Sequence, residues 1–444
     1  MTSVEQSSTS AAEEVEGARS RWAIDLRPLR VPTYRRLWLG TGVSMYGYQF
    51  TAVAVPFEMY ALTRDSFWVG LLGVAGLVPL LIFGLWGGAA ADAVDRRRLL
   101  LASSVLAWVT TFGLLVQALL QVGSPTLLLG LVALQSATFA VSSPARQAII
   151  PRLVPAHLLP SANTLSFTIL QVSLVFGPLT AGLVFATWRP EIALPIAYAL
   201  DALLFTVSLW ATVRLPSVPP GASSEERPAG PDERGTGVPG LRSIVDGIRY
   251  LATTPVLLLS FAIDLIAMVL AMPRALFPEM AVERFGGGAA IGWLFGALGI
   301  GGLLGGLTSG WIGRVRRQGL ALVVAVVGWG LAVAVAGLAG QLWLVVGLLA
   351  LAGAADLVSA VFRQSILQTY APDRLQGRLQ GVYTVVIAGG PRLGDLRAGA
   401  TAAAFGAGFA WVGGGIASAV LALALAVAFP ALLRYRRAAR SAES

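Results

Sequence analysis

Apolar residues gather along the chain in about a dozen runs of roughly 20 residues, separated by short segments rich in Arg, Pro and Gly. A helix of about 20 residues crosses the ~30 Å hydrocarbon core of a bilayer. The pattern therefore predicts an all-α membrane protein with twelve spanning helices. Their expected ranges are 37–62, 67–91, 99–122, 126–150, 162–187, 192–213, 255–277, 289–312, 318–338, 342–362, 379–405 and 409–432.

Polar stretches divide these spans into two sets of six. The stretch that follows the sixth span is rich in Pro, Gly and Ser, a composition typical of flexible linkers. Residues 241–252 space their apolar side chains as a helix does, which predicts a short amphipathic helix on the membrane surface. We therefore expect a cytoplasmic tail, a six-helix bundle, a cytoplasmic linker, a second six-helix bundle and a second cytoplasmic tail, over 1–36, 37–213, 214–254, 255–432 and 433–444.

Two phrases of sequence occur twice. The phrase Arg-Gln-x-Ile-x5-Pro-x2-Leu begins at Arg146 and again at Arg363, 217 residues later. A glycine pair that begins at Gly87 is followed by an acidic, arginine-rich turn, and its echo begins 218 residues later at Gly305. An offset of half the chain between apolar segments indicates two related helical bundles, an arrangement found in many secondary transporters.

Composition excludes several classes of protein. Hydrophobic residues make up 56% of the chain and charged residues 12%, which is too little polar surface for a soluble protein of this size. The sequence contains no Cys and no Lys. Disulfides, thiolate catalysis, the lysine-containing phosphate loop and Schiff-base chemistry are therefore excluded. The single histidine, His157, is expected in a solvated turn.

The 32 basic residues are all Arg, and their distribution is asymmetric. With the amino terminus inside, 26 of them fall on cytoplasmic segments and only Arg64, Arg189 and Arg284 fall outside, while Arg274, Arg392 and Arg397 lie within or at the ends of spans. This bias follows the positive-inside rule and predicts a multi-pass protein of the cytoplasmic membrane with both termini in the cytoplasm. The net charge of +9 then indicates contact with anionic lipids. Nucleic acid is not an expected partner, because the arginines form no single soluble face.

The turn between the second and third spans carries a recognisable motif. It reads Gly88-x3-Asp92-Ala93-Val94-Asp95-Arg96-Arg97-Arg98. In this motif the chain resembles the major facilitator superfamily, whose signature here is roughly G-x3-D-R/K-x-G-x-R/K-R/K. Ala93 replaces the usual base and Asp95 the usual glycine.

The resemblance implies two six-helix halves that are closed on the inner side by a charged gate. Gly88 would let helix backbones approach closely. Asp92 would accept hydrogen bonds from backbone N–H groups or from an arginine. Arg146 and Arg363, at matching ends of the fourth and tenth spans, would supply further cations. The expected gate residues are Gly88, Asp92, Arg96, Arg97, Arg146 and Arg363; ordinary positive-inside anchoring remains the alternative for the arginines.

A second motif lies in the fifth span. Gly177-Pro178-x2-Ala181-Gly182 resembles the motif of the superfamily's antiporters, with Ala181 in place of a glycine. Pro178 removes a backbone hydrogen bond and kinks the helix, although such kinks are also common in other membrane helices. The chain as a whole resembles the drug- and siderophore-exporting branch of the superfamily. That likeness also rests on Phe50–Pro56, Pro144–Gln147 and Met272–Pro278.

Several ionisable residues are expected inside the spans, where such groups usually mark a pathway because they are costly to insert. The resemblance places spans one, four, seven and ten around a central cavity. It therefore implies that Glu58, Asp264 and Asp356 face water and substrate, with Gln49 and Gln135 as polar neighbours.

A carboxyl group that is alternately exposed to water and buried can bind and release a proton. We expect Asp264 to be the proton carrier. Glu58 is also placed as a contact to the substrate or to an outer gate, or as an interfacial side chain.

Arg392 and Asp395 are three residues apart in the eleventh span and can pair on one helix face. They are expected either on the transport pathway or as a neutralised structural pair, and Arg397 could extend their network. Asp201, in a span that the resemblance places away from the cavity, is expected to form a packing hydrogen bond.

These expectations together imply a monomeric secondary transporter. It would export a small amphipathic molecule, such as a siderophore, an antibiotic or another drug, by alternating access. The proton gradient would drive it, without a cofactor or a metal. A proton-coupled importer and a non-transporting receptor or scaffold remain as alternatives. An enzyme is disfavoured, because no nucleophile, metal or paired-carboxylate constellation has credible spacing.

Overall fold

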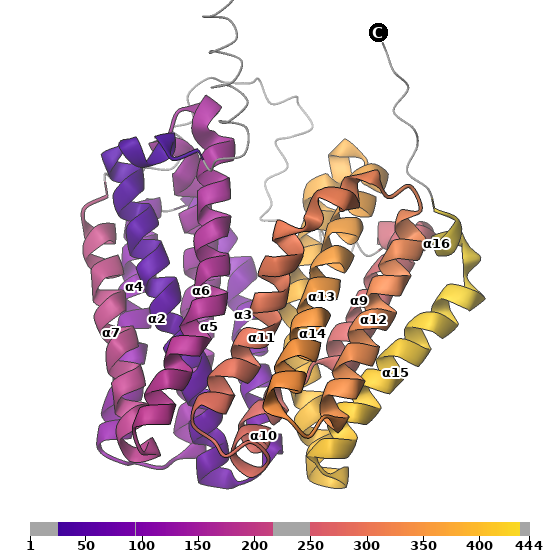
Figure 1. Ribbon diagram of the computed structural model, residues 1–444. Helices are drawn as coiled ribbons and strands as arrows, with labels where there is room; N and C mark the ends of the chain where they lie inside the picture. The colour runs from indigo at the N-terminus through magenta and orange to yellow at the C-terminus, as the bar shows by residue number, and fades with distance from the viewer. Residues whose placement is uncertain (1–24, 94, 216–248, 436–444) are drawn as a thin grey trace, which may run out of the picture.

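The computed structural model describes residues 25–93, 95–215 and 249–435, and within them every regular element is a helix (Figure 1). The predicted tails and most of the predicted linker with its amphipathic helix lie outside these ranges. The first half contains η1 (Arg27–Arg30), α2 (Pro32–Thr63), α3 (Ser66–Ala93), α4 (Arg96–Leu119), α5 (Pro125–Leu153), η2 (Ala156–Leu158), α6 (Leu159–Thr187) and α7 (Pro190–Val213).

The second half repeats this arrangement with one interruption. Its elements are α9 (Pro255–Ala271), η4 (Arg274–Leu276), α10 (Phe277–Glu283), α11 (Ala289–Leu307), η5 (Ser309–Arg314), α12 (Gln318–Leu338), α13 (Leu342–Tyr370), α14 (Asp373–Phe405), α15 (Ala407–Ala428) and α16 (Pro430–Arg434). The seventh span was expected to be continuous over 255–277. It breaks instead after Ala271, where Pro273 lacks the N–H that an uninterrupted helix needs.

Helix ends follow local sequence signals. Asp95 caps α4 by accepting hydrogen bonds from the backbone N–H groups of Arg97 and Arg98. Ser124 caps α5 in the same way through the N–H of Leu127, and a proline opens that helix.

Ten helical segments of the described chain are long and apolar enough to cross a membrane. The helices α2 and α14, with 32 and 33 residues, have the length but a more polar composition. These two helices carry Glu58, Arg392 and Asp395. Together with the ten apolar segments they make up the twelve helices that the sequence predicts.

The described chain begins and ends on the same side of the bundle, which we call the terminal side (Figure 1, top). On the opposite side the two halves meet. A Cβ atom on Gly73 of α3 would lie 2.5 Å from the backbone oxygen of Arg392 in α14. Helices α11 and α6 approach each other as closely, because a Cβ on Gly292 of α11 would lie 2.5 Å from the Pro178 oxygen and 2.6 Å from the Gly182 Cα in α6. Glycines therefore permit both crossings between the halves.

Two hydrogen bonds add to this closure on the opposite side. The Tyr60 hydroxyl donates to Glu283 and the Ser66 hydroxyl donates to Glu279. Both carboxylates belong to α10, the short helix that follows the break in the seventh span. The break thus directs α10 across the closed end of the first half.

Candidate functional site

A cavity of about 980 Å³ lies between the two halves. Its wall runs from Arg274, near the closed side, to Gly84 of α3, Ser143 of α5 and Gly381 of α14, which lie nearer the terminal side. Most of the lining is apolar, with a few polar side chains spread among it. The uncharged polar lining residues include Tyr48, Gln49, Thr51, Gln135, Ser136 and Thr384.

Four predicted pathway residues, Gln49, Gln135, Arg392 and Asp395, do line this cavity. Gln49 also contacts the kink of α6, because a Cβ on Gly177 would lie 2.4 Å from the Cβ of Gln49. Pro178 lines the same wall. The antiporter-like motif therefore positions a cavity side chain in addition to shaping its helix.

Arg392 and Asp395 do not form the structural pair that their spacing allows. No ion pair joins them among the described residues, and the Arg392 guanidinium reaches only the Ala388 oxygen, at 3.5 Å. One oxygen of the Asp395 carboxylate has no hydrogen-bond partner among the described residues. Both charges therefore remain directed at the cavity, which agrees with the pathway alternative.

Arg397 does not extend this network. Its guanidinium donates to the Val269 oxygen at 3.2 Å, to the Leu270 oxygen and to the Ala410 oxygen at 3.1 Å. Two of these carbonyls lie in the last turn of α9, where no helical N–H remains to satisfy them. Arg397 therefore acts as a cap at the break in the seventh span.

Asp264 and Arg363 form a buried ion pair within the second half. The Asp264 side chain on α9 is 3% exposed and the Arg363 side chain on α13 is 4% exposed. A second guanidinium nitrogen of Arg363 lies 3.9 Å from Asp356, whose side chain is 40% exposed. The structure thus joins three residues for which we expected separate roles. Two carboxylates share one guanidinium, and one Asp264 oxygen has no hydrogen-bond partner among the described residues.

None of Glu58, Asp264 and Asp356 is among the residues that line the described cavity. The expectation that they face water and substrate is wrong for Glu58 and Asp264, which are buried, whereas the Asp356 side chain is 40% exposed. Glu58 is 5% exposed and points toward α4 and α7. Gln117 donates to both of its oxygens, at 2.9 and 3.1 Å, and the Tyr198 hydroxyl donates to one of them. The neighbouring Pro56 does line the cavity. Residues two apart on a helix face opposite ways, which the span assignment could not reveal.

Asp201 behaves as the packing group that was expected. Its carboxylate accepts a hydrogen bond from the Thr51 hydroxyl, which links α7 to α2. Its side chain is 1% exposed.

The expected gate residues are only partly described. Gly88 and Asp92 lie in the last turns of α3, but the side chains of Asp92 and Arg96 are outside the described part of the structure. Arg97 donates to the Val213 oxygen at 2.6 Å and so ties α4 to the end of α7. The role of these residues as a gate remains a prediction.

Arg146 and Arg363 occupy equivalent places in the repeat but have different surroundings. Arg146 borders a small pocket of about 170 Å³ with Trp38 and Ser166. Its Nε atom has no hydrogen-bond partner, and it forms no ion pair with another described residue. The two arginines therefore have different partners among the described residues, and their part in an inner gate remains a prediction.

Sequence reasoning missed Arg274 as a cavity residue and assigned it only to the end of a span. The structure places its exposed side chain in the cavity wall, on η4 just after the helix break. Pro273 in front of it was the available signal, since a proline at a span end predicts a break that can turn the next side chain inward.

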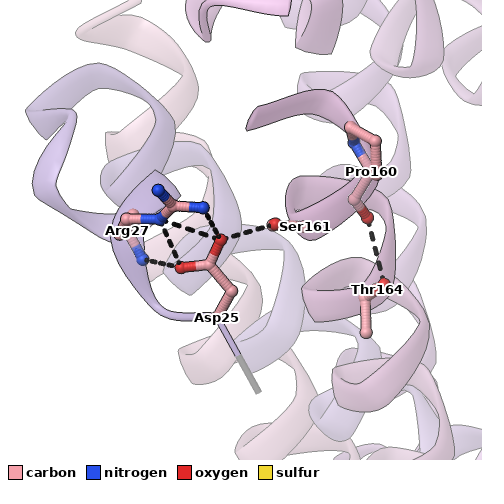
Figure 2. A network of polar contacts seen from close by, with 5 residues as sticks. All are labelled: Asp25, Arg27, Pro160, Ser161 and Thr164. Carbon is pink, nitrogen blue, oxygen red and sulfur yellow. Dashed lines mark hydrogen bonds and ion pairs between the residues drawn. The ribbon is translucent and has the colours of Figure 1, made fainter. Parts of the chain in front are cut away.

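A separate polar cluster lies on the terminal side (Figure 2). Arg27 donates to both Asp25 oxygens, and the Ser161 hydroxyl donates to Asp25 at 2.7 Å. These contacts hold the pKa of Asp25 well below its usual range, with the Arg27 hydrogen bonds as the main cause. The cluster joins the start of the described chain to α6 and lies apart from the cavity.

Comparisons with known proteins agree with this architecture. The family described as transmembrane secretion effector matches residues 23–443. The enterobactin exporter EntS of Citrobacter koseri is 29% identical over 390 residues, which cover 85% of this chain and 87% of that protein. EntS of Escherichia coli has the same identity over the same length and coverage.

Solved structures share the fold at low sequence identity. The nucleoside transporter NupG gives a TM-score of 0.70 with 15% identity, covering 91% of this chain and 99% of that chain. A bacterial homologue of the human lysosomal transporter Spinster, described as inward-facing and unoccupied, gives 0.68 with 17% identity, covering 91% and 96%. The D-xylose–proton symporter gives 0.65 with 14% identity, covering 89% and 97%.

These findings confirm the major facilitator fold that the sequence predicts. The chain is a multi-pass membrane transporter and is not an enzyme.

Proposed function

The chain belongs to the transmembrane secretion effector family of the major facilitator superfamily, and from that premise we propose that it exports a small amphipathic molecule in exchange for protons. The observation that carries this proposal is the central cavity, which is largely apolar but holds a few polar and charged side chains. Ligand sites for small amphipathic molecules have this character.

The orientation follows from the arginines. Most of the 32 lie on segments of the terminal side, so we place that side, and both termini, in the cytoplasm. In this orientation the halves would touch near the outer surface, and the transporter would be closed to the outside. Substrate would reach the cavity from the cytoplasm and leave after the two halves rock about it.

Proton coupling is assigned to the network of Asp264, Arg363 and Asp356. One guanidinium balances one carboxylate, so the second carboxylate leaves a negative charge that a proton can neutralise. Asp356, with a 40% exposed side chain, is the member most accessible to water. Asp264, paired to another helix through Arg363, couples the protonation state to the packing of α9 against α13.

Export is favoured over import by the relatives that are named enterobactin exporters and by the antiporter-like kink at Gly177 and Pro178. Import remains the second candidate, because a D-xylose–proton symporter shares the fold. We further propose that the protein works as a monomer in the cytoplasmic membrane and needs only the proton gradient.

Uptake into energised inverted membrane vesicles tests the direction of transport. The probes are iron-free enterobactin, other siderophores, dyes and antibiotics, each with a protonophore control. An exporter accumulates at least one of them inside the vesicles, and the protonophore abolishes the accumulation. Accumulation by intact cells together with none in inverted vesicles would replace the proposal with import.

A further inference from the structure

The charged residues in the cavity wall are unbalanced. Arg274, Arg392 and Asp395 are the charged side chains of the described lining, so two guanidinium groups face one carboxylate. The described lining of the cavity therefore carries one more positive than negative charge, and the carboxylate of Asp356 lies outside this lining.

Arg274 carries most of this excess. Its side chain is exposed to the cavity, and no hydrogen bond or ion pair joins it to another described residue. Its charge acts on Asp395 and Asp356 without direct contact. A guanidinium inside the membrane without a partner is costly, and such groups usually serve a substrate or an ion.

The position of Arg274 suits a ligand rather than packing. It lies on η4, between α3 and α14, at the closed end of the cavity. Arg392 lies on α14 in the same wall, with its Nε 3.3 Å from where a Cβ on Gly76 would be. Gly76 thus leaves room beside the Arg392 guanidinium. Aromatic and apolar groups that include Tyr48, Phe295 and Leu72 complete the wall around the two cations.

We infer that the cavity selects cargo with an acidic group, which Arg274 and Arg392 bind while the apolar wall holds the remaining body of the molecule. A planar guanidinium matches a carboxylate or a phosphate group through two parallel hydrogen bonds. This inference rests on the proposed function, since it names the chemical class of the exported molecule. Amphipathic cations are the class that it excludes.

Binding of a matched probe pair to the purified full-length protein in neutral detergent tests this inference. The pair is pyrenebutyrate and its methyl ester, which share one apolar body and differ in charge. Energy transfer from the protein's tryptophans to pyrene reports the dissociation constant of each. We expect the acid to bind about tenfold to a hundredfold more tightly than the ester, the range of a charge-assisted hydrogen bond.

Variants assign the preference to the two arginines. Arg274→Gln and Arg392→Gln should each reduce it, and the double variant should abolish it. Arg274→Lys, which keeps the charge but loses the planar fork, should retain part of it. Arg316→Gln is the control, because Arg316 is exposed outside the cavity and its loss changes the net charge equally. Size-exclusion profiles and circular dichroism verify that each variant is folded.

Three results would overturn the inference. Equal dissociation constants for acid and ester in the wild type would show that the cavity has no preference for an acidic group. A preference for the acid that persists in a folded double variant would show that Arg274 and Arg392 do not cause it. Loss of the preference when phosphatidylglycerol is added would assign the two cations to a lipid headgroup instead of cargo. A chain that prefers the acid but never accumulates any probe in vesicles would instead reject export and leave the anion site standing.

Discussion

The two halves share one helical plan but distribute their ionisable groups differently. In the second half, Arg363 is buried with Asp264 and lies 3.9 Å from Asp356. In the first half, the equivalent Arg146 forms no ion pair among the described residues, and Gly47 stands 217 residues before Asp264. The duplicated sequence thus specifies helices and turns in both halves, whereas among the described residues the buried ion pair lies in the second half alone.

The buried carboxylate of the first half has a different environment. Glu58 is held by the neutral donors Gln117 and Tyr198, which join α2 to α4 and α7. Glu58 therefore connects three helices through neutral donors, and no charged partner among the described residues could change its ion pairing during transport. We therefore assign a structural role to Glu58 and proton coupling to Asp264.

The largest expected effect tests the difference between the carboxylates of the two halves. Asp264→Asn should reduce proton-driven accumulation in inverted vesicles to the level seen with a protonophore, because the paired carboxylate can no longer titrate. Glu58→Gln is the matched control and should retain most of the activity, since the amide oxygen still accepts from Gln117 or Tyr198. Immunoblots of the vesicles would normalise both rates to protein abundance. Full activity of Asp264→Asn would reject the assignment.

Stability should differ between the twin arginines. Arg363→Gln leaves two carboxylates without a cation, and removing one partner of a buried pair typically costs about 3–5 kcal/mol. Arg146→Gln removes a cation that has no ion-pair partner among the described residues and should change stability by less than about 1 kcal/mol. Thermal unfolding in detergent would measure both. Equal losses would mean that the two halves are electrostatically alike after all.

The halves resemble each other most where they touch, through glycines. Gly292→Ala would place a Cβ 2.5 Å from the Pro178 oxygen, and overpacking of this kind costs about 1–3 kcal/mol. We expect the contact on the closed side to open and the population to shift toward the alternate conformation. Because the chain has no Cys, spin labels on Leu62→Cys and Phe405→Cys, both exposed in the wild type, would report the distance between the halves.

Gly328→Ala is the control for this experiment, because nothing lies within 4 Å of the added Cβ. An unchanged distance distribution in Gly292→Ala would show that this crossing does not hold the closed side together.

The smallest effect concerns Asp25, at the start of the first half. Its folded-state pKa is lowered by Arg27 and Ser161, so its contribution to stability is present above the ordinary aspartate pKa of about 3.9 and is lost as the pH falls below it. Exposed pairs contribute little. The melting temperature of Asp25→Asn should lie slightly below that of the wild type at pH 7, and the two should converge in acid. A difference that grows toward low pH would contradict this assignment.

Much of the fold was predictable because it rests on periodicity and length. Apolar runs of membrane-spanning length locate the spans, and the phrases at Arg146 and Arg363 reveal the repeat. The break at Pro273 was missed, since prolines also occur inside uninterrupted helices such as α2 and α6.

The site was less predictable, because its chemistry depends on helix rotation and on distant partners. Glu58 lies on the helix face opposite to the one expected. Asp264 and Arg363 are 99 residues apart, and nothing local identifies them as a pair. Composition and spacing show which spans carry charge, but only packing shows which charges meet.

Cargo-driven proton release tests the central claim most directly, namely that the second half carries the proton site. Inverted vesicles are energised so that their lumen is acidic, and an acridine dye reports the pH gradient when the cargo identified by vesicle uptake is added. We predict that cargo dissipates part of the gradient in vesicles with the wild type or Glu58→Gln, and has no effect with Asp264→Asn or in vesicles without the protein. A response that survives in Asp264→Asn and disappears in Glu58→Gln would contradict the account.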